Sequence, residues 1–150
     1  PVTSLDRNYI YFKSKNTNET TASIYSPEYE PMDRLVCFTF HYNMFGQSVG
    51  DLRLFQLLQV DDGLSEENML MKISGNQGKE WHHAYVQLRQ VNSSYQLVFE
   101  AKQEVGDLSS IALDKFSLSQ DKTNCQLLKE SIEAKYQAVD NGKHLKSKLN

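Results

Sequence analysis

The stretch Cys37-Phe-Thr-Phe-His-Tyr-Asn-Met44 decides the fold class of this chain of 150 residues. Its large apolar side chains stand at every second position, with polar side chains between most of them. Alternate side chains of an extended strand point to opposite faces, so this spacing predicts a strand with one buried face. The apolar face comprises Phe38, Phe40, Tyr42 and Met44, and we expect Phe38, Phe40 and Tyr42 in the core.

The same period of two recurs on both sides of this stretch. It predicts further strands at 9–12, 21–25, 51–60, 68–73, 81–91, 95–101 and 111–118. Phe99 and Leu113 lie on the apolar faces of the last two, and we expect them in the core as well. Short strands separated by turn signals at intervals of about 8–12 residues are typical of a β-sandwich or barrel.

The last predicted strand contains a shift in phase. Ile111 and Leu113 share one face. Phe116 and Leu118 join that face only if one extra residue lies between the two pairs. The sequence therefore predicts a β-bulge at Asp114-Lys115.

After Cys125 the spacing of apolar residues becomes helical. Leu128, Ile132, Tyr136 and Val139 recur at this spacing in a segment rich in Lys, Glu, Gln and Ala. We therefore expect an all-β domain at 1–125 and a helical extension or linker at 126–150. The helix buries only a narrow stripe, so packing on the sandwich and linking to a further domain both remain open.

Composition excludes several classes of protein. Hydrophobic residues make up 39% of the chain, which is enough for a core. The formal net charge of -3 argues against nonspecific binding to nucleic acid, which requires a strongly positive surface. No apolar run approaches the roughly 20 residues of a membrane span. The chain lacks a start Met and a signal peptide, so we interpret it as a piece of a larger protein.

The cysteines and two short triplets bear on the compartment. Cys37 and Cys125 are too far apart for a CxxC redox or zinc motif. Taken alone, the pair is equally compatible with a disulfide and with two buried thiols. Asn18 and Asn92 each begin an N-glycosylation triplet in a polar stretch, as surface acceptors do. The triplets favour an extracellular location.

Three segments carry a combination of motifs. Residues 37–46 read C-x-x-F-x-Y-x-M-x-G, residues 75–81 read G-x-x-G-x-x-W, and residues 95–101 precede I-A-L-D at 111–114 and Cys125. In order and spacing they resemble the MAM domain, an extracellular module named for meprin, neuropilin and the receptor tyrosine phosphatase mu. The resemblance covers roughly residues 5–125.

The resemblance implies a jelly-roll-like antiparallel β-sandwich, with an appended C-terminal helix here. It also implies a disulfide between Cys37 and Cys125 and a core position for Trp81. The implied function is a non-catalytic extracellular adhesion or assembly module. Such a module contacts protein partners, a second copy of itself among them, or spaces domains in a larger secreted or membrane-anchored protein. A carbohydrate-binding module is the alternative, since jelly rolls often bind sugars.

Two departures from the family concern a cation site. The family's opening segment, with its first cysteine pair, is absent, so we expect an N-terminally incomplete domain. The family usually carries two aspartates where this chain has Asp114-Lys115. Hard cations require several oxygen ligands, so the lysine weakens the case for a structural calcium or sodium ion at Asp114. A carboxylate that bonds the backbone of the bulge is the alternative, and no other cofactor is expected.

The sequence contains no arrangement that points to catalysis. Neighbouring positions of a strand face opposite ways, so His82 and His83 are expected to diverge rather than share a metal. No GxSxG, P-loop, GxGxxG or HExxH motif is present. We therefore expect recognition surfaces instead, in loops around 45–50, 61–67 and 102–109. The aromatic contact candidates are Tyr29, Phe45 and Tyr85.

Overall fold

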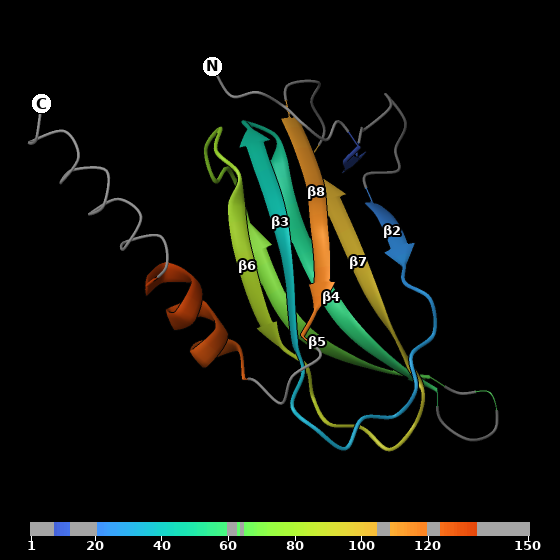
Figure 1. Cartoon of the computed structure of the whole chain (residues 1–150). Helices are drawn as coiled ribbons and strands as arrows, with labels where there is room; N and C mark the ends of the chain where they lie inside the picture. The colour runs from blue at the N-terminus through green and yellow to red at the C-terminus, as the bar shows by residue number, and fades with distance from the viewer. Residues whose placement is uncertain are drawn as a thin grey trace, which may run out of the picture.

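The computed structural model describes residues 8–12, 21–59, 63, 65–104, 109–119 and 124–134. Within them lie eight strands and a helix at residues 125–134 (Figure 1). The strands are β1 (Ile10–Phe12), β2 (Thr21–Tyr25), β3 (Cys37–Gly46), β4 (Val49–Gln59), β5 (Ser65–Ser74), β6 (His82–Gln87), β7 (Tyr95–Gln103) and β8 (Ser109–Leu118).

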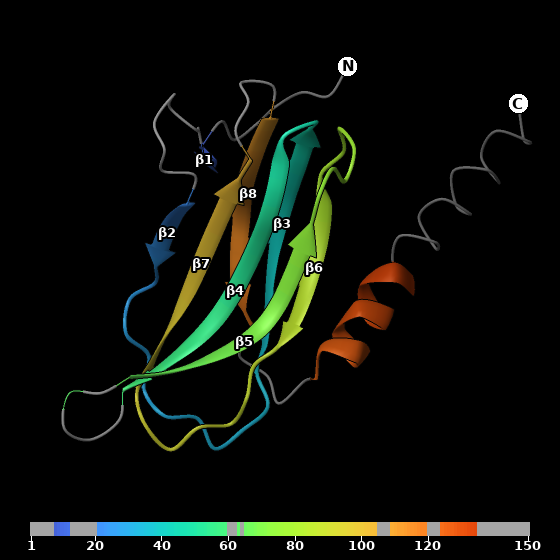
Figure 2. The same cartoon turned by 180° about the vertical axis from the view of Figure 1, so that it is seen from behind.

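The strands form two antiparallel sheets that face each other (Figures 1 and 2). Sheet A has the order β1-β8-β3-β6, and sheet B has the order β2-β7-β4-β5. Neighbours in each sheet are mostly distant in sequence, so long-range pairing holds the layers together. The predicted all-β sandwich is confirmed.

The core fills the space between the sheets. Phe40 and Met44 of β3 are fully buried, and Phe99 of β7 meets Phe40 edge-on with ring centroids 4.9 Å apart. Phe38 and Leu113 are buried beside them, whereas Tyr42 is half-buried at the margin of the same cluster. The apolar face of the opening stretch is thus the centre of the core.

Strand β6 ends sooner than expected, at Gln87 rather than at 91. Gln87 is the cross-strand partner of Cys37, where β3 begins, and the N–H of Leu88 still donates to the Val36 carbonyl at 3.0 Å. The residues beyond Leu88 have no strand in sheet A to pair with. There the side chain of Gln56 on β4 binds the backbone of Arg89 instead. It is fully buried, accepts the backbone N–H of Arg89 at 3.1 Å and donates to the Arg89 carbonyl at 3.0 Å. Both polar ends of its amide are therefore satisfied.

The predicted bulge in β8 is confirmed. Thr39 pairs with Ser117, but His41, two residues on, pairs with Asp114, which leaves one extra residue on β8. Lys115 adopts a φ of 54°, in the left-handed region that side chains rarely enter. Its backbone N–H donates to Oδ1 of Asp114 at 2.7 Å. The carboxylate therefore supports the bulge, as the alternative interpretation of Asp114 proposed.

The predicted disulfide is confirmed between Cys37 and Cys125. It joins the start of β3 to the first residue of the helix, which lies beside β6 (Figures 1 and 2). Oδ1 of Asn124 accepts the N–H of Leu127 at 2.9 Å and caps this helix. Among the described residues, no helix has the length and apolar character needed to cross a membrane.

Candidate interaction surfaces

An apolar row crosses the outer face of sheet B. Its members are successive cross-strand partners, one from each strand: Tyr25, Val98, Phe55 and Met69. Tyr25 and Met69 stand at the ends and are 59% and 50% exposed, whereas Phe55 is half-buried and Val98 is only 7% exposed. We refer to these four residues as the apolar row.

Ion pairs border the apolar row on one side. Arg53 donates to Asp51 at 3.0 Å and to Glu100 at 3.2 Å, while Lys72 lies 3.2 Å from Asp51. A hydrogen bond from Ser74 and the contacts with Lys72 and Arg53 lower the pKa of Asp51. Partly exposed pairs of this kind stabilise a fold only slightly. Their main effect is to place charges of both signs next to an apolar surface.

A hollow of about 320 Å³ lies on the outer face of sheet A. We call it the aromatic hollow, because three of its lining side chains are Tyr or Trp. It is lined by Tyr9, Tyr11, Asn43, Lys79, Trp81, Ser110 and Ala112.

The prediction that Trp81 lies in the core is wrong, because Trp81 is 44% exposed and lines this hollow. Ala84 and Val86 of β6 point into the core, so alternation directs Trp81 to the outer face. There its ring meets that of Tyr9 edge-on at 5.9 Å.

His41 and His83 form a stacked pair on the outer face of sheet A. They are cross-strand partners on β3 and β6, with ring centroids 4.3 Å apart. The Tyr85 hydroxyl lies 2.9 Å from Nδ1 of His83. His82 belongs elsewhere: its ring stacks on Tyr42, and its Nε2 lies 2.9 Å from the carbonyl oxygen of Gln77. The two imidazoles of the His82-His83 pair therefore have separate partners.

Burial lowers the pKa of both His41 and His83. The positive charge of Lys115 lowers both further, and His41 also lowers the pKa of His83. Asp114 acts in the opposite direction on His41. The fold therefore favours the neutral imidazoles.

Acidification is expected to destabilise the domain through this pair. Unfolding returns each imidazole to its ordinary pKa of 6.5, so the unfolded chain binds more protons below that pH. The stabilisation is complete above 6.5 and is lost as the pH falls through the lowered folded-state values. Urea unfolding at about pH 7.5 and about pH 5 measures the difference. Replacing both histidines by glutamine should reduce it, and an unchanged difference would contradict this origin.

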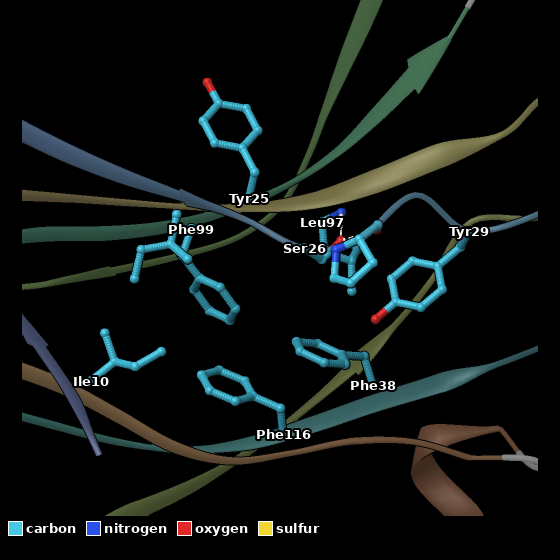
Figure 3. Close-up of a pocket in the computed structure, with 10 residues that line it drawn as sticks. Ile10, Tyr25, Ser26, Tyr29, Phe38, Leu97, Phe99 and Phe116 are labelled. Carbon is cyan, nitrogen blue, oxygen red and sulfur yellow. Dashed lines mark hydrogen bonds between the residues drawn. The ribbon is translucent and has the colours of Figure 1, made fainter. Parts of the chain in front are cut away.

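An apolar slot of about 220 Å³ opens at one edge of the sandwich. In Figure 3 the side chains of Ile10, Phe38, Phe99 and Phe116 point toward a shared centre, whereas Tyr25 points away from it. The slot lies where β1 has only three residues and where β2 ends at Tyr25, two residues before Pro27, which cannot donate to a ladder. Its lining is almost wholly apolar, so it offers little to orient a polar substrate.

The surroundings of Asp114 do not fit a cation. The described residues contain no group of three His, Cys, Asp or Glu side chains able to hold a metal together. Oδ1 of Asp114 already accepts the Lys115 N–H, and the Lys115 side chain brings a positive charge to this part of β8. These contacts give no support for a calcium or sodium ion at Asp114, which stays a prediction.

The expected recognition loops differ from the observed structure. Residues 45–50 are mostly strand, because only Gln47 and Ser48 separate β3 from β4. β5 begins at Ser65 and takes up the end of the 61–67 loop, while 60–62 and 64 lie outside the described residues. The same holds for 105–108 within the 102–109 loop.

The remaining predicted positions have varied surroundings. Asn92 is exposed in the connection between β6 and β7, whereas Asn18 lies outside the described residues. Phe45 is exposed and carries Nζ of Lys79 5.4 Å above its ring. Tyr29 packs on Tyr95, with ring centroids 5.5 Å apart. Exposed acceptor positions suit a glycan.

Comparisons with known proteins agree with the fold. A family model described as MAM domain, meprin/A5/mu matches residues 2–126. Neuropilin-1a of Danio rerio is 31% identical over 112 residues, which are 74% of this chain and 12% of that protein. MAM domain-containing glycosylphosphatidylinositol anchor protein 2 of Mus musculus is 35% identical over 92 residues, 61% of this chain and 9% of that protein.

The chain spans only about a tenth of the length of these two relatives. Among solved structures, Family 16 Carbohydrate Binding Module-2 has a TM-score of 0.52 at 8% identity and covers 75% of this chain and 76% of its own. That likeness is one of fold alone. The family model covers most of the chain, and the chain belongs to the MAM domain family.

Proposed function

We propose that this domain is a non-catalytic extracellular module that contacts another protein through the apolar row. The row is the observation that carries the proposal. It crosses all four strands of sheet B, and Tyr25 and Met69 are exposed at its two ends. Aromatic residues and methionine are enriched in protein interfaces.

A second copy of the chain is the partner to test first. The border of the apolar row carries Arg53 and Lys72 as well as Asp51 and Glu100, so its charges are mixed in sign. A copy related by a two-fold axis presents the same mixture, which permits pairing instead of general repulsion. Spacing of neighbouring domains is the role that remains if no protein contact is found.

The extracellular location has two supports. Disulfides persist in oxidising compartments and are rare in the cytosol, and this domain contains one. Asn92, in a glycosylation triplet, is exposed. The absence of catalysis is inferred from the lack of catalytic motifs in the sequence.

Met69→Glu is expected to abolish contact between copies, because it places a charge in the apolar row. Leu127→Glu is the matched control, since Leu127 on the helix is 57% exposed against 50% for Met69. Beads coated with the wild-type domain or with Leu127→Glu should aggregate, and beads coated with Met69→Glu should stay dispersed. Sedimentation velocity on the soluble domain provides a second readout. Wild-type beads that stay dispersed, or equal aggregation by all three proteins, would contradict self-contact through the row.

A further inference from the structure

We propose that the aromatic hollow binds a pyranose ring of an oligosaccharide. The hollow lies on the outer face of sheet A, and the apolar row lies on the outer face of sheet B. This binding would be an activity separate from protein contact, so the two are testable independently.

The shape of the hollow comes from small side chains between large ones. Ala112 on β8 is the cross-strand partner of both Tyr11 on β1 and Asn43 on β3. Ser110 lies two positions along β8, on the same face. These small residues leave a floor below the flanking rings. The volume of about 320 Å³ lies within the range of small-molecule sites, though at its lower end.

The walls offer ring surface to a sugar. Tyr9, Tyr11 and Trp81 are all exposed, and the ring planes of Tyr9 and Trp81 meet at 72°. Trp81 stays 44% exposed beside Tyr9, so part of its indole ring is open to pack against the C–H groups of a pyranose. Tyr and Trp side chains also lose little conformational entropy on binding.

Polar groups of the hollow match the hydroxyls of a sugar. Ser110, Asn43 and Lys79 line the hollow together with the rings, and their side chains carry a hydroxyl, an amide and an ammonium group. Nδ2 of Asn43 donates to the carbonyls of Lys79 at 2.8 Å and Glu80 at 3.0 Å. These bonds hold the segment just before Trp81 against β3, so the site is largely preformed.

Because the lining is partly polar and partly apolar, it favours a sugar over an apolar protein side chain as the occupant. An inserted Leu or Phe would remove water from these polar groups without replacing their hydrogen bonds, which is costly. The slot in Figure 3 lacks this mixture, because its lining is almost wholly apolar. A pyranose can pack its C–H groups on the aromatic rings of the aromatic hollow and place its hydroxyls against the polar side chains.

The test is an array of neutral, sialylated and glycosaminoglycan oligosaccharides, with each hit measured by titration calorimetry on the folded domain. Trp81→Ala and Tyr11→Ala should each weaken binding about tenfold through loss of one ring contact. Tyr25→Ala is the matched control, because Tyr25 and Tyr11 are both 59% exposed but lie on opposite sheets. It should bind sugar as the wild type does.

Three results would overturn the proposal: an array without saturable hits, hits unaffected by Trp81→Ala, or an equal loss with Tyr25→Ala. Tyr11→Phe keeps the ring and should therefore bind sugar nearly as the wild type does, and Trp81→Ala remains the test of ring removal if Tyr11→Ala fails to fold. Met69→Glu should retain sugar binding, so failure of the protein-contact proposal is distinguishable from failure of this one. Loss of protein contact in Tyr11→Ala without any sugar hit would reassign the hollow to a protein partner.

Discussion

Replacing Cys37 and Cys125 together by alanine is expected to lower the free energy of unfolding by about 4–5 kcal/mol. The disulfide closes a long loop, since the two cysteines are 88 residues apart. In the chain-entropy view, opening such a loop restores many conformations to the unfolded state. Alanine is chosen because Cys37 is fully buried and a serine hydroxyl there would add a separate desolvation cost. Guanidinium unfolding followed by circular dichroism measures the loss.

Reduction of the wild-type disulfide provides the control for this variant. The reduced domain and the double alanine variant should unfold at similar denaturant concentrations. A loss below about 1 kcal/mol in both would mean that the unfolded chain is already constrained without the bond.

Phe40→Ala is expected to cost about 3–5 kcal/mol, the usual range for removing a fully buried ring. Phe40 lies at the centre of the core and meets Phe99 edge-on. Its ring centroid is 5.6 Å from that of Phe38. Phe45→Ala is the matched control, because Phe45 is exposed on the opposite face of the same strand. Its cost should stay below about 1 kcal/mol, as for most surface changes. Equal costs would contradict the assignment of the two faces of β3.

The strands were predictable because the sheets have one buried face each. Alternation in β3 indicated its buried face, although the strand runs on to Gly46, and the phase shift at Asp114 indicated the bulge in β8. Both signals are local, since they depend on neighbouring positions of one strand. The early end of β6 was not predictable, because it depends on where β3 begins.

Trp81 shows how a family expectation can outweigh a local pattern. Ala84 and Val86 already defined the inward phase of β6, and Trp81 is out of that phase. The apolar row was also missed, although a signal existed. Phe55 stands at an odd position of β4, among core residues at even positions such as Leu54. Large apolar residues at both odd and even positions indicate that both faces of a strand carry apolar surface.

The aromatic hollow was beyond sequence reasoning for a different reason. Its lining comes from four segments, and only the register of β1 and β3 against β8 brings Tyr11, Asn43 and Ala112 together. Register depends on long-range pairing, which no local pattern specifies.

We propose that the outer face of sheet B, and not that of sheet A, contacts protein. The most direct measurement uses the photo-crosslinking residue benzoylphenylalanine, placed at position 25 in one variant and at position 11 in another. Beads coated with each variant are mixed and then irradiated. Covalent dimers are expected from position 25, and none above background from position 11. Dimers from position 11 alone, or from neither position, would contradict this proposal.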